Sequence, residues 1–249
     1  MSPSSVFFDL LFDGVTQARG ARIALFGAGG KTSLLHALGQ EFAREHARVL
    51  LSSLTKAVPD ERFPLLVLND DTPPASLPFT PAERLLALLR SGHTPGKHAG
   101  LEPEQLRQSC ELADLCIFEN DGAAKHPLKV HRPPDPRVPD WSTHCVILVG
   151  AEVLDAPIGG GLVHRPEAFC AHWGWHDTDR LDEERLCRVL LGPRGYRAML
   201  PAILDPVYLV NKADRWPAKA RRLARALRAG GAERVHLGSL QEGWHERVQ

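Results

Sequence analysis

A short glycine-rich segment follows an apolar run near the N-terminus of this chain. The apolar run ARIALF leads into the sequence GAGGKTS, and a helix-period run, LLHALGQEFA, follows directly. This order predicts a strand, a tight loop and a helix N-terminus, where backbone N–H groups and the helix dipole surround a phosphate. A lysine there reaches the terminal phosphates, and the next threonine offers a hydroxyl to Mg²⁺. The predicted phosphate-binding residues are Gly27, Ala28, Gly29, Gly30, Lys31, Thr32 and Ser33.

This loop departs from the strict pattern G-x-x-x-x-G-K-[ST], because Leu25 stands six residues before Lys31. We therefore expect a shortened phosphate loop. One alternative is a glycine-rich strand-to-helix turn with an ordinary surface lysine. Another is the dinucleotide pattern G-x-G-x-x-G, which needs its third glycine in the span that Lys31 and Thr32 occupy.

The rest of the chain alternates short apolar runs with longer helix-period stretches, which is typical of βαβ units on a parallel sheet. Near-continuous apolar runs such as CVILVG and PVYLVN indicate strands that helices cover on both faces. We expect a single α/β domain, P-loop NTPase-like, with a mostly parallel sheet and Pro- or Gly-rich loop insertions, over residues 1–249. The expected strands are 21–27, 48–53, 65–69, 114–119, 143–150, 206–211 and 233–237. The expected helices are 31–45, 81–90, 103–112, 182–191 and 218–229.

A polar turn, NKAD, ends the late apolar run PVYLV. In guanine-nucleotide proteins the aspartate of the pattern N-K-x-D accepts the two N–H groups of the guanine edge. The asparagine supports the loop, and the lysine stem covers the base. The alternative is a polar strand-end turn that reads no base. The predicted base-binding residues are Asn211, Lys212 and Asp214, with Gly238 and Ser239 after the next strand.

Two acids, Glu119 and Asp121, end another apolar run in the sequence ENDGA. The carboxyl ends of parallel strands meet at one edge of a sheet, so we expect both acids beside the phosphate loop, holding Mg²⁺ or orienting water. The alternative is a turn of solvated acids. The predicted catalytic residues are Lys31, Glu119 and Asp121, and the predicted metal ligands are Thr32, Thr55, Glu119 and Asp121.

The charge balance argues against some partners. Lysine plus arginine and aspartate plus glutamate each total 30, so the chain has no net charge with which to attract nucleic acid or anionic lipid. No apolar run approaches the roughly 18 residues that a membrane span needs, and acids stand where a signal peptide has basic residues. We expect a cytoplasmic protein that binds neither nucleic acid nor membrane.

Taken together and in order, six segments resemble a known family, the YqeC-like accessory proteins of selenium-dependent molybdenum hydroxylases. These segments are GAGGKTSLL (27–35), LTK (54–56), ENDGA (119–123), HPLK (126–129), VHRPE (163–167) and VNKAD (210–214). The chain departs from the family in its reduced threonine-rich stretch, in Asn120, and in Pro134, Asp135 and Pro136, which replace a His-Glu-Pro sequence. The resemblance implies a nucleotide-dependent role in maturing a client molybdenum hydroxylase.

These observations predict a protein that binds a purine nucleoside triphosphate with Mg²⁺, GTP in preference to ATP, and hydrolyses it slowly. One alternative is an ATP-dependent ligase or kinase, with an acceptor site formed by His126, Lys129, His164 and Arg165. The other is a nucleotide-sensing chaperone that hydrolyses nothing by itself and docks on its client.

Overall fold

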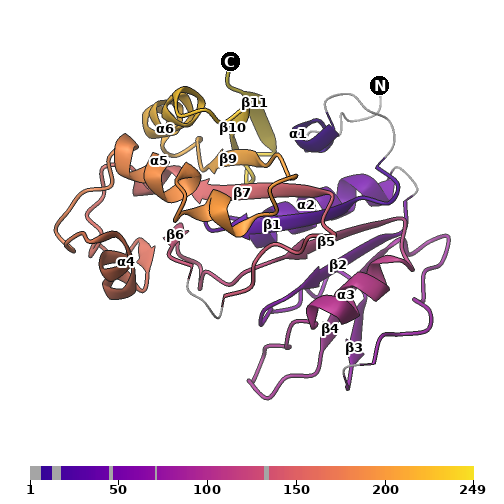
Figure 1. Ribbon diagram of the computed structural model, residues 1–249. Coiled ribbons are helices and arrows are strands. Elements are labelled where there is room, and N and C mark those ends of the chain that lie inside the picture. Colours follow the sequence, from indigo (N-terminus) through magenta and orange to yellow (C-terminus); the bar gives the residue numbers. More distant parts are fainter. Residues whose placement is uncertain (1–6, 13–17, 45–46, 71, 132–134) are drawn as a thin grey trace.

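A nine-stranded sheet forms the centre of the computed structural model, which describes residues 7–12, 18–44, 47–70, 72–131 and 135–249 (Figure 1). Its strands are β1 (Arg22–Gly27), β2 (Val49–Ser53), β3 (Leu65–Leu68), β4 (Leu85–Arg90), β5 (Leu115–Glu119), β7 (His144–Gly150), β9 (Val207–Asn211), β10 (Arg234–Ser239) and β11 (Trp244–Arg247). Their order is β11-β10-β9-β7-β1-β5-β2-β4-β3. Neighbouring strands are parallel throughout, except that β10 and β11 are antiparallel.

The remaining elements are helices and a small second sheet. The α-helices are α1 (Phe8–Phe12), α2 (Lys31–Arg44), α3 (Pro103–Cys110), α4 (Pro166–Trp173), α5 (Glu183–Leu191) and α6 (Pro217–Ala229). The 3₁₀ helices are η1 (Ala151–Val153) and η2 (Tyr196–Met199), and β6 (Leu128–Lys129) pairs in parallel with β8 (Val163–His164). None of the described helices is long and apolar enough to cross a membrane.

The two faces of the large sheet pack against different helices, because successive side chains of a strand point to opposite faces. In β1, Ile23 and Leu25 belong to a buried cluster with α1 and α2. Ala24 and Phe26 belong to a second cluster, with α3, α5 and α6. The predicted α/β fold with a mostly parallel sheet covered on both faces is therefore confirmed.

The parallel arrangement brings the carboxyl ends of β1, β2, β5 and β9 to one edge of the sheet. Strand β1 lies between β5 and β7, and β9 follows β7 on that side. The segments that follow these strands include the glycine-rich loop, the acidic turn and the NKAD turn. This edge is where a ligand binds in open α/β sheets.

The predicted helix over residues 81–90 is wrong, because strand β4 occupies Leu85–Arg90. The leucines of its sequence, LLALLR, suit a helical face as well as a short apolar strand, so periodicity alone does not separate the two. In the fold, β4 lies between β2 and β3 and pairs with both. Backbone hydrogen bonds on both sides, together with the burial of Leu86 and Leu88 in the core, favour the strand.

The other predicted strands and helices are confirmed, with ends that differ by a few residues. Besides strand β4, the elements that the sequence did not predict are α1, α4, η1, η2, β6, β8 and β11. Glu45, the end of the predicted helix 31–45, lies outside the described residues, as does Pro134.

Candidate functional site

Three glycines shape the loop between β1 and α2. Gly27, Gly29 and Gly30 have φ angles of +92°, +86° and +141°, which side chains rarely adopt. A Cβ on Gly29 would lie 2.5 Å from the backbone nitrogen of Gly150, and one on Gly30 would lie 2.4 Å from Nδ2 of Asn211. The loop therefore needs glycine for its conformation and for its close approach to β7 and β9.

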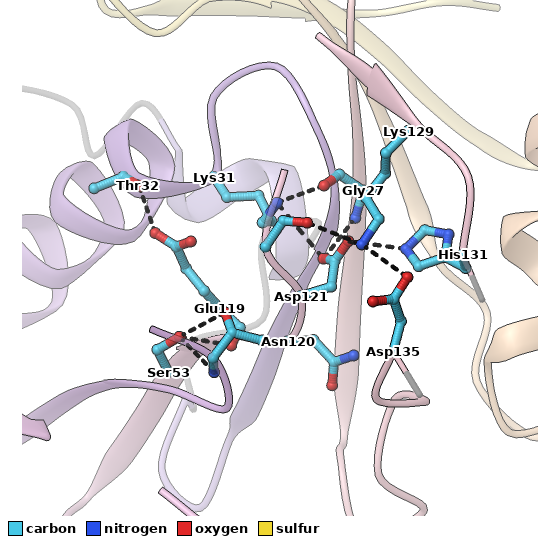
Figure 2. Close-up of polar contacts among 12 residues, drawn as sticks. Gly27, Lys31, Thr32, Ser53, Glu119, Asn120, Asp121, Lys129, His131 and Asp135 are labelled. Atoms are coloured by element: carbon cyan, nitrogen blue, oxygen red, sulfur yellow. Dashed lines mark hydrogen bonds and ion pairs between the residues drawn. The ribbon is translucent and has the colours of Figure 1, made fainter. Parts of the chain in front are cut away.

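Lys31 opens α2, and its side chain is only 5% exposed. Its Nζ donates a hydrogen bond to the carbonyl oxygen of Gly27 and lies 3.6 Å from Oδ1 of Asp121 (Figure 2). An ammonium group has three N–H donors, and this is its one hydrogen bond among the described residues. The backbone N–H groups of the first turn of α2 also have no partner within the helix. The start of α2 thus has donors available to an anion.

Asp121 lies fully buried beneath this loop. Its Oδ1 accepts a hydrogen bond from the backbone N–H of Gly27 at 3.1 Å, and its Oδ2 lies 2.8 Å from Nε2 of His131 and 3.3 Å from Nζ of Lys129. Burial alone would raise the pKa of Asp121, but Lys31, His131 and Lys129 together hold it below its usual range. The carboxylate is therefore charged and holds the loop to its support.

Glu119 is the acid that faces the start of α2. Its Oε1 accepts a hydrogen bond from Oγ1 of Thr32 at 2.5 Å (Figure 2). Burial raises the pKa of Glu119, while the charge of Lys31 and the hydrogen bond from Thr32 act against this rise. These two oxygens are a fitting donor pair for Mg²⁺, which proteins hold with one or two carboxylates plus phosphate oxygens of a substrate. In the described part of the chain, no group of three or more His, Cys, Asp or Glu side chains is arranged to hold a metal ion.

Thr55 lies near these groups. Its Oγ1 is 3.4 Å from Oγ of Ser53, and its backbone N–H donates to the same Ser53 oxygen at 3.1 Å. A Cβ on Gly122 would lie 3.7 Å from the Thr55 hydroxyl. The structure therefore places Thr55 against the acidic turn, beside the carboxyl end of β5.

The NKAD turn contacts the glycine-rich loop through its asparagine. Asn211 donates from Nδ2 to the carbonyl oxygen of Gly29 at 2.7 Å and accepts the N–H of Leu240 at 3.1 Å. Lys212 has a φ of +66° and forms an ion pair with Glu152. Asp214 is exposed. The turn thus links the loop after β1 to the loop after β10 and leaves the Asp214 carboxylate in solvent.

One groove of about 1310 Å³ joins these parts. The predicted site residues that line it are Gly29, Gly30, Lys31, Thr32, Ser33, Glu119, Asn211, Lys212, Asp214 and Ser239. The predicted site residues that do not line it are Gly27, Ala28, Thr55, Asp121 and Gly238. The edge of the sheet therefore brings the three motifs together, with Asp121 below the surface.

Residues suggested for an acceptor surface lie close together in the fold, since Lys129 pairs with His164 between β6 and β8. His126 lines the groove, and its ring lies 5.2 Å from that of His164. Lys129 is only 1% exposed and forms ion pairs with Asp121 and Asp135, so the suggestion that it lies on an accessible surface is wrong. The sequence did not indicate an acidic partner for Lys129, because Lys129, Asp121 and Asp135 come together only in the folded chain.

His131 is a residue of the site that sequence reasoning missed. Its ring stacks on Phe26 with centroids 4.2 Å apart and meets Tyr196 edge-on at 4.5 Å. The Tyr196 hydroxyl in turn bonds both the N–H and the carbonyl of Lys129, at 3.0 and 2.9 Å. The sequence contained one indication of this position. His131 stands two residues after Lys129, and in an extended segment residues two apart point to the same side.

Comparisons with known proteins identify the family of this chain. The sequence model of the family described as "YqeC protein" matches residues 23–167, which is more than half of the chain. The chain is 27% identical over 252 residues to "Uncharacterized protein YqeC" of Escherichia coli (strain K12), and the match covers 97% of this chain and 94% of the relative. No solved structure is significantly similar to the chain. From the glycine-rich loop to the VHRPE segment, the motifs lie within the matched range, and the chain belongs to the YqeC family.

Proposed function

We propose that the chain binds a purine nucleoside triphosphate with Mg²⁺ in the groove at the carboxyl edge of the sheet and hydrolyses it slowly. The observation that carries this proposal is the joining of three elements in one groove. These are the glycine loop with Lys31, the Thr32–Glu119 pair, and the NKAD turn. Each of these elements is common at the end of a strand. Together they would serve the phosphates, the Mg²⁺ ion and the base of a bound nucleoside triphosphate.

Lys31 and the first turn of α2 would bind the phosphates. The Lys31 ammonium has donors left for the β and γ oxygens, and the N–H groups and dipole of α2 favour the same negative charge. Thr32 and Glu119 would hold Mg²⁺, which neutralises charge on the phosphates as the leaving group departs. Asp121 would position the loop through Gly27 and Lys31 instead of touching the nucleotide.

Glu119 is the side chain that we propose orients the attacking water. It lies in the groove beside Thr32, with one carboxylate oxygen bonded to the Thr32 hydroxyl and the second left to accept a hydrogen bond from water. For hydrolysis, the chain has to position the reacting groups and neutralise the charge on the phosphates. These two effects account for most of the catalysis of phosphoryl transfer.

Asp214 is proposed to select guanine. It lines the end of the groove together with Ser239, on the side away from Glu119 in the strand order. A carboxylate there would accept N1–H and N2–H₂ of guanine, and adenine would leave these interactions unmade. The proposed preference is GTP over ATP.

The biological role that we propose is that of an accessory protein in the maturation of a selenium-dependent molybdenum hydroxylase. This part rests on the family resemblance alone, since the name of the relative assigns no activity. Transfer to an acceptor, as in a ligase or kinase, is the second candidate. It is favoured by the extent of the groove, which continues to Lys56, Lys97 and His126.

The first experiment is a binding titration of GTP, GDP, ATP and ADP with and without Mg²⁺, followed by phosphate release from the tightest triphosphate. Glu119→Gln should abolish most Mg²⁺-dependent release while changing nucleotide affinity little. The matched control is Glu184→Gln, an exposed glutamate on α5. Release that continues unchanged in Glu119→Gln would refute the hydrolytic role, and release that begins only with an added small-molecule acceptor would favour transfer.

A further inference from the structure

Glu152 is a buried acid at the carboxyl edge of the sheet that the proposed nucleotide site does not use. It belongs to η1, is the second residue after the end of β7, and is only 9% exposed. Strand β7 lies between β1 and β9, and its last residue, Gly150, is in register with Asn211 of β9. Glu152 therefore follows a strand that ends between the glycine-rich loop and the NKAD turn.

The side chain of Glu152 lies against the backbone of Gly150. A Cβ on Gly150 would lie 2.3 Å from Oε2 of Glu152, and a Cβ on Gly29 would lie 2.5 Å from the backbone nitrogen of Gly150. This Oε2 atom has almost no accessible surface, and Glu152 does not line the groove. Its other carboxylate oxygen, Oε1, forms the ion pair with Lys212. The contact through which Glu152 can act on a ligand in the groove is therefore Lys212.

Lys212 has a conformation that depends on its contacts. Its φ of +66° lies in the left-handed region, which is uncommon for a residue with a side chain and persists where the surrounding structure holds it. Its carbonyl oxygen accepts the backbone N–H of Trp216 at 3.0 Å, and the N–H of Ala213 donates to the carbonyl oxygen of Gly238 at 2.9 Å. These bonds fix the backbone of the turn, and the ion pair with Glu152 fixes the ammonium group.

Two lysines that line the groove, Lys31 and Lys212, use their ammonium groups differently. The Lys212 ammonium donates a hydrogen bond directly to the Glu152 carboxylate. The Lys31 ammonium donates to a carbonyl oxygen, lies 3.6 Å from Asp121, and stands at a helix N-terminus that favours an anion. A phosphate chain is therefore better held at Lys31. With its ammonium bound to Glu152, Lys212 offers a ligand mainly its methylene stem, which suits the flat face of a base.

We propose that Glu152 is a positioning residue of the nucleotide site. By holding the Lys212 ammonium, it keeps the methylene stem of Lys212 against the base and leaves the triphosphate to Lys31. Glu152 itself would touch neither the base nor the phosphates. This inference rests on the proposed function, because it assumes that a nucleoside triphosphate lies in the groove with its base at the NKAD turn.

GTP and inorganic tripolyphosphate, each with Mg²⁺, are the two probes, because they carry the same phosphate chain and differ by the guanosine. Calorimetric titration compares the unaltered protein with Glu152→Gln. We expect the affinity for GTP to fall about tenfold and the affinity for tripolyphosphate not to fall. A glutamate with a purely structural role would weaken the binding of both probes equally, and that result would overturn the proposal. Glu183→Gln removes an ion-paired glutamate outside the groove and should change neither affinity.

A double-mutant cycle tests whether Glu152 acts through Lys212. Lys212→Met removes the ammonium and keeps a stem of similar length. In that background, Glu152→Gln should lower the affinity for GTP by less than about twofold, because the contact that it would break is already absent. Losses that add in the double variant would overturn the proposal. If Glu152→Gln does not fold, Glu152→Asp takes its place with the same expectations, since its carboxylate reaches less far toward Lys212.

The two probes also separate this inference from the function on which it rests. If the unaltered protein binds GTP no more tightly than tripolyphosphate, or binds neither, the proposed nucleotide site is wrong and the inference falls with it. If GTP binds more tightly than tripolyphosphate and Glu152→Gln leaves the ratio of the two affinities unchanged, the inference alone is overturned.

Discussion

The glycine-rich loop before α2 and the NKAD turn lie at the same edge of the sheet, but the chain supports them very differently. Below the loop, the buried carboxylate of Asp121 bonds Gly27 and faces Lys31, Lys129 and His131. At the turn, Asn211 is bonded to the loop, whereas Asp214 is exposed. The comparison indicates that the shape of the glycine-rich loop comes from the protein's own contacts. The NKAD turn, which we propose reads the base, leaves the Asp214 carboxylate exposed.

The largest expected difference between the two regions is in stability. Asp121→Ala would leave Lys129 and His131 buried without their shared carboxylate and should lower the free energy of unfolding by about 3–5 kcal/mol. Asp214→Ala, in an exposed turn, should change it by less than about 0.5 kcal/mol. Urea denaturation of both variants measures the difference. Similar values for the two would remove the distinction between the regions.

The next effect is on triphosphate affinity. Lys31→Ala should remove a charge-assisted contact of about 1.5–3 kcal/mol, which weakens binding at least about tenfold, while the fold survives. Lys125→Ala removes the same charge from an exposed position in the same groove and should cost less than about threefold. Calorimetric titration compares the two. An unchanged affinity in a folded Lys31→Ala protein would contradict the phosphate-loop assignment.

A substitution of Asn211 tests the link between the glycine-rich loop and the NKAD turn. Asn211→Ala would remove hydrogen bonds to Gly29 and from Leu240, and the unpaired buried groups should cost about 1–3 kcal/mol of stability. Triphosphate affinity should also fall, since the loop loses a support. Asn69→Ala, at an exposed asparagine, is the control. If Asn211→Ala lowers neither quantity below the control, the two loops are independent.

Asp214→Asn should leave stability unaltered and change base preference. The amide would no longer match the guanine edge but would match xanthine, so preference should shift from GTP toward xanthosine triphosphate by about tenfold. Competition titration with GTP, ATP and xanthosine triphosphate measures the shift. Equal ATP and GTP affinities in the unaltered protein, insensitive to the substitution, would show Asp214 to be a turn residue only.

The smallest expected effect is a pH dependence from His131. Burial lowers the pKa of this residue in the folded chain from its usual 6.5, so below pH 6.5 the unfolded chain binds a proton that the folded chain does not. The free energy of unfolding should therefore fall with decreasing pH, by at most about 1.4 kcal/mol per pH unit. His131→Gln should flatten this slope between pH 6.5 and 5.5. Identical slopes in both proteins would mean that His131 is not held neutral.

Local sequence patterns predicted most of the fold, because strands and helices with a clear hydrophobic period can be recognised from the sequence. The prediction of a helix over 81–90 failed because the four leucines of this segment suit either a helix or a strand. Only the pairing with β2 and β3 favours the strand. Short elements such as β6 and β8 have too few residues to show a period. Their pairing with each other is a contact between distant segments.

The sequence by itself determined that a strand, a glycine turn and a helix with Lys31 at its start follow one another, because φ preferences and amphipathic periodicity are local properties. It also placed Glu119, Asp121 and Asn211 at strand ends. Only the tertiary structure decided that Glu119 faces the groove while Asp121 lies beneath it, and that Lys129 and His131 converge on that buried carboxylate. The physical reason is that burial and ion pairing depend on which strands are neighbours, and β1 is far apart in the chain from its neighbours β5 and β7.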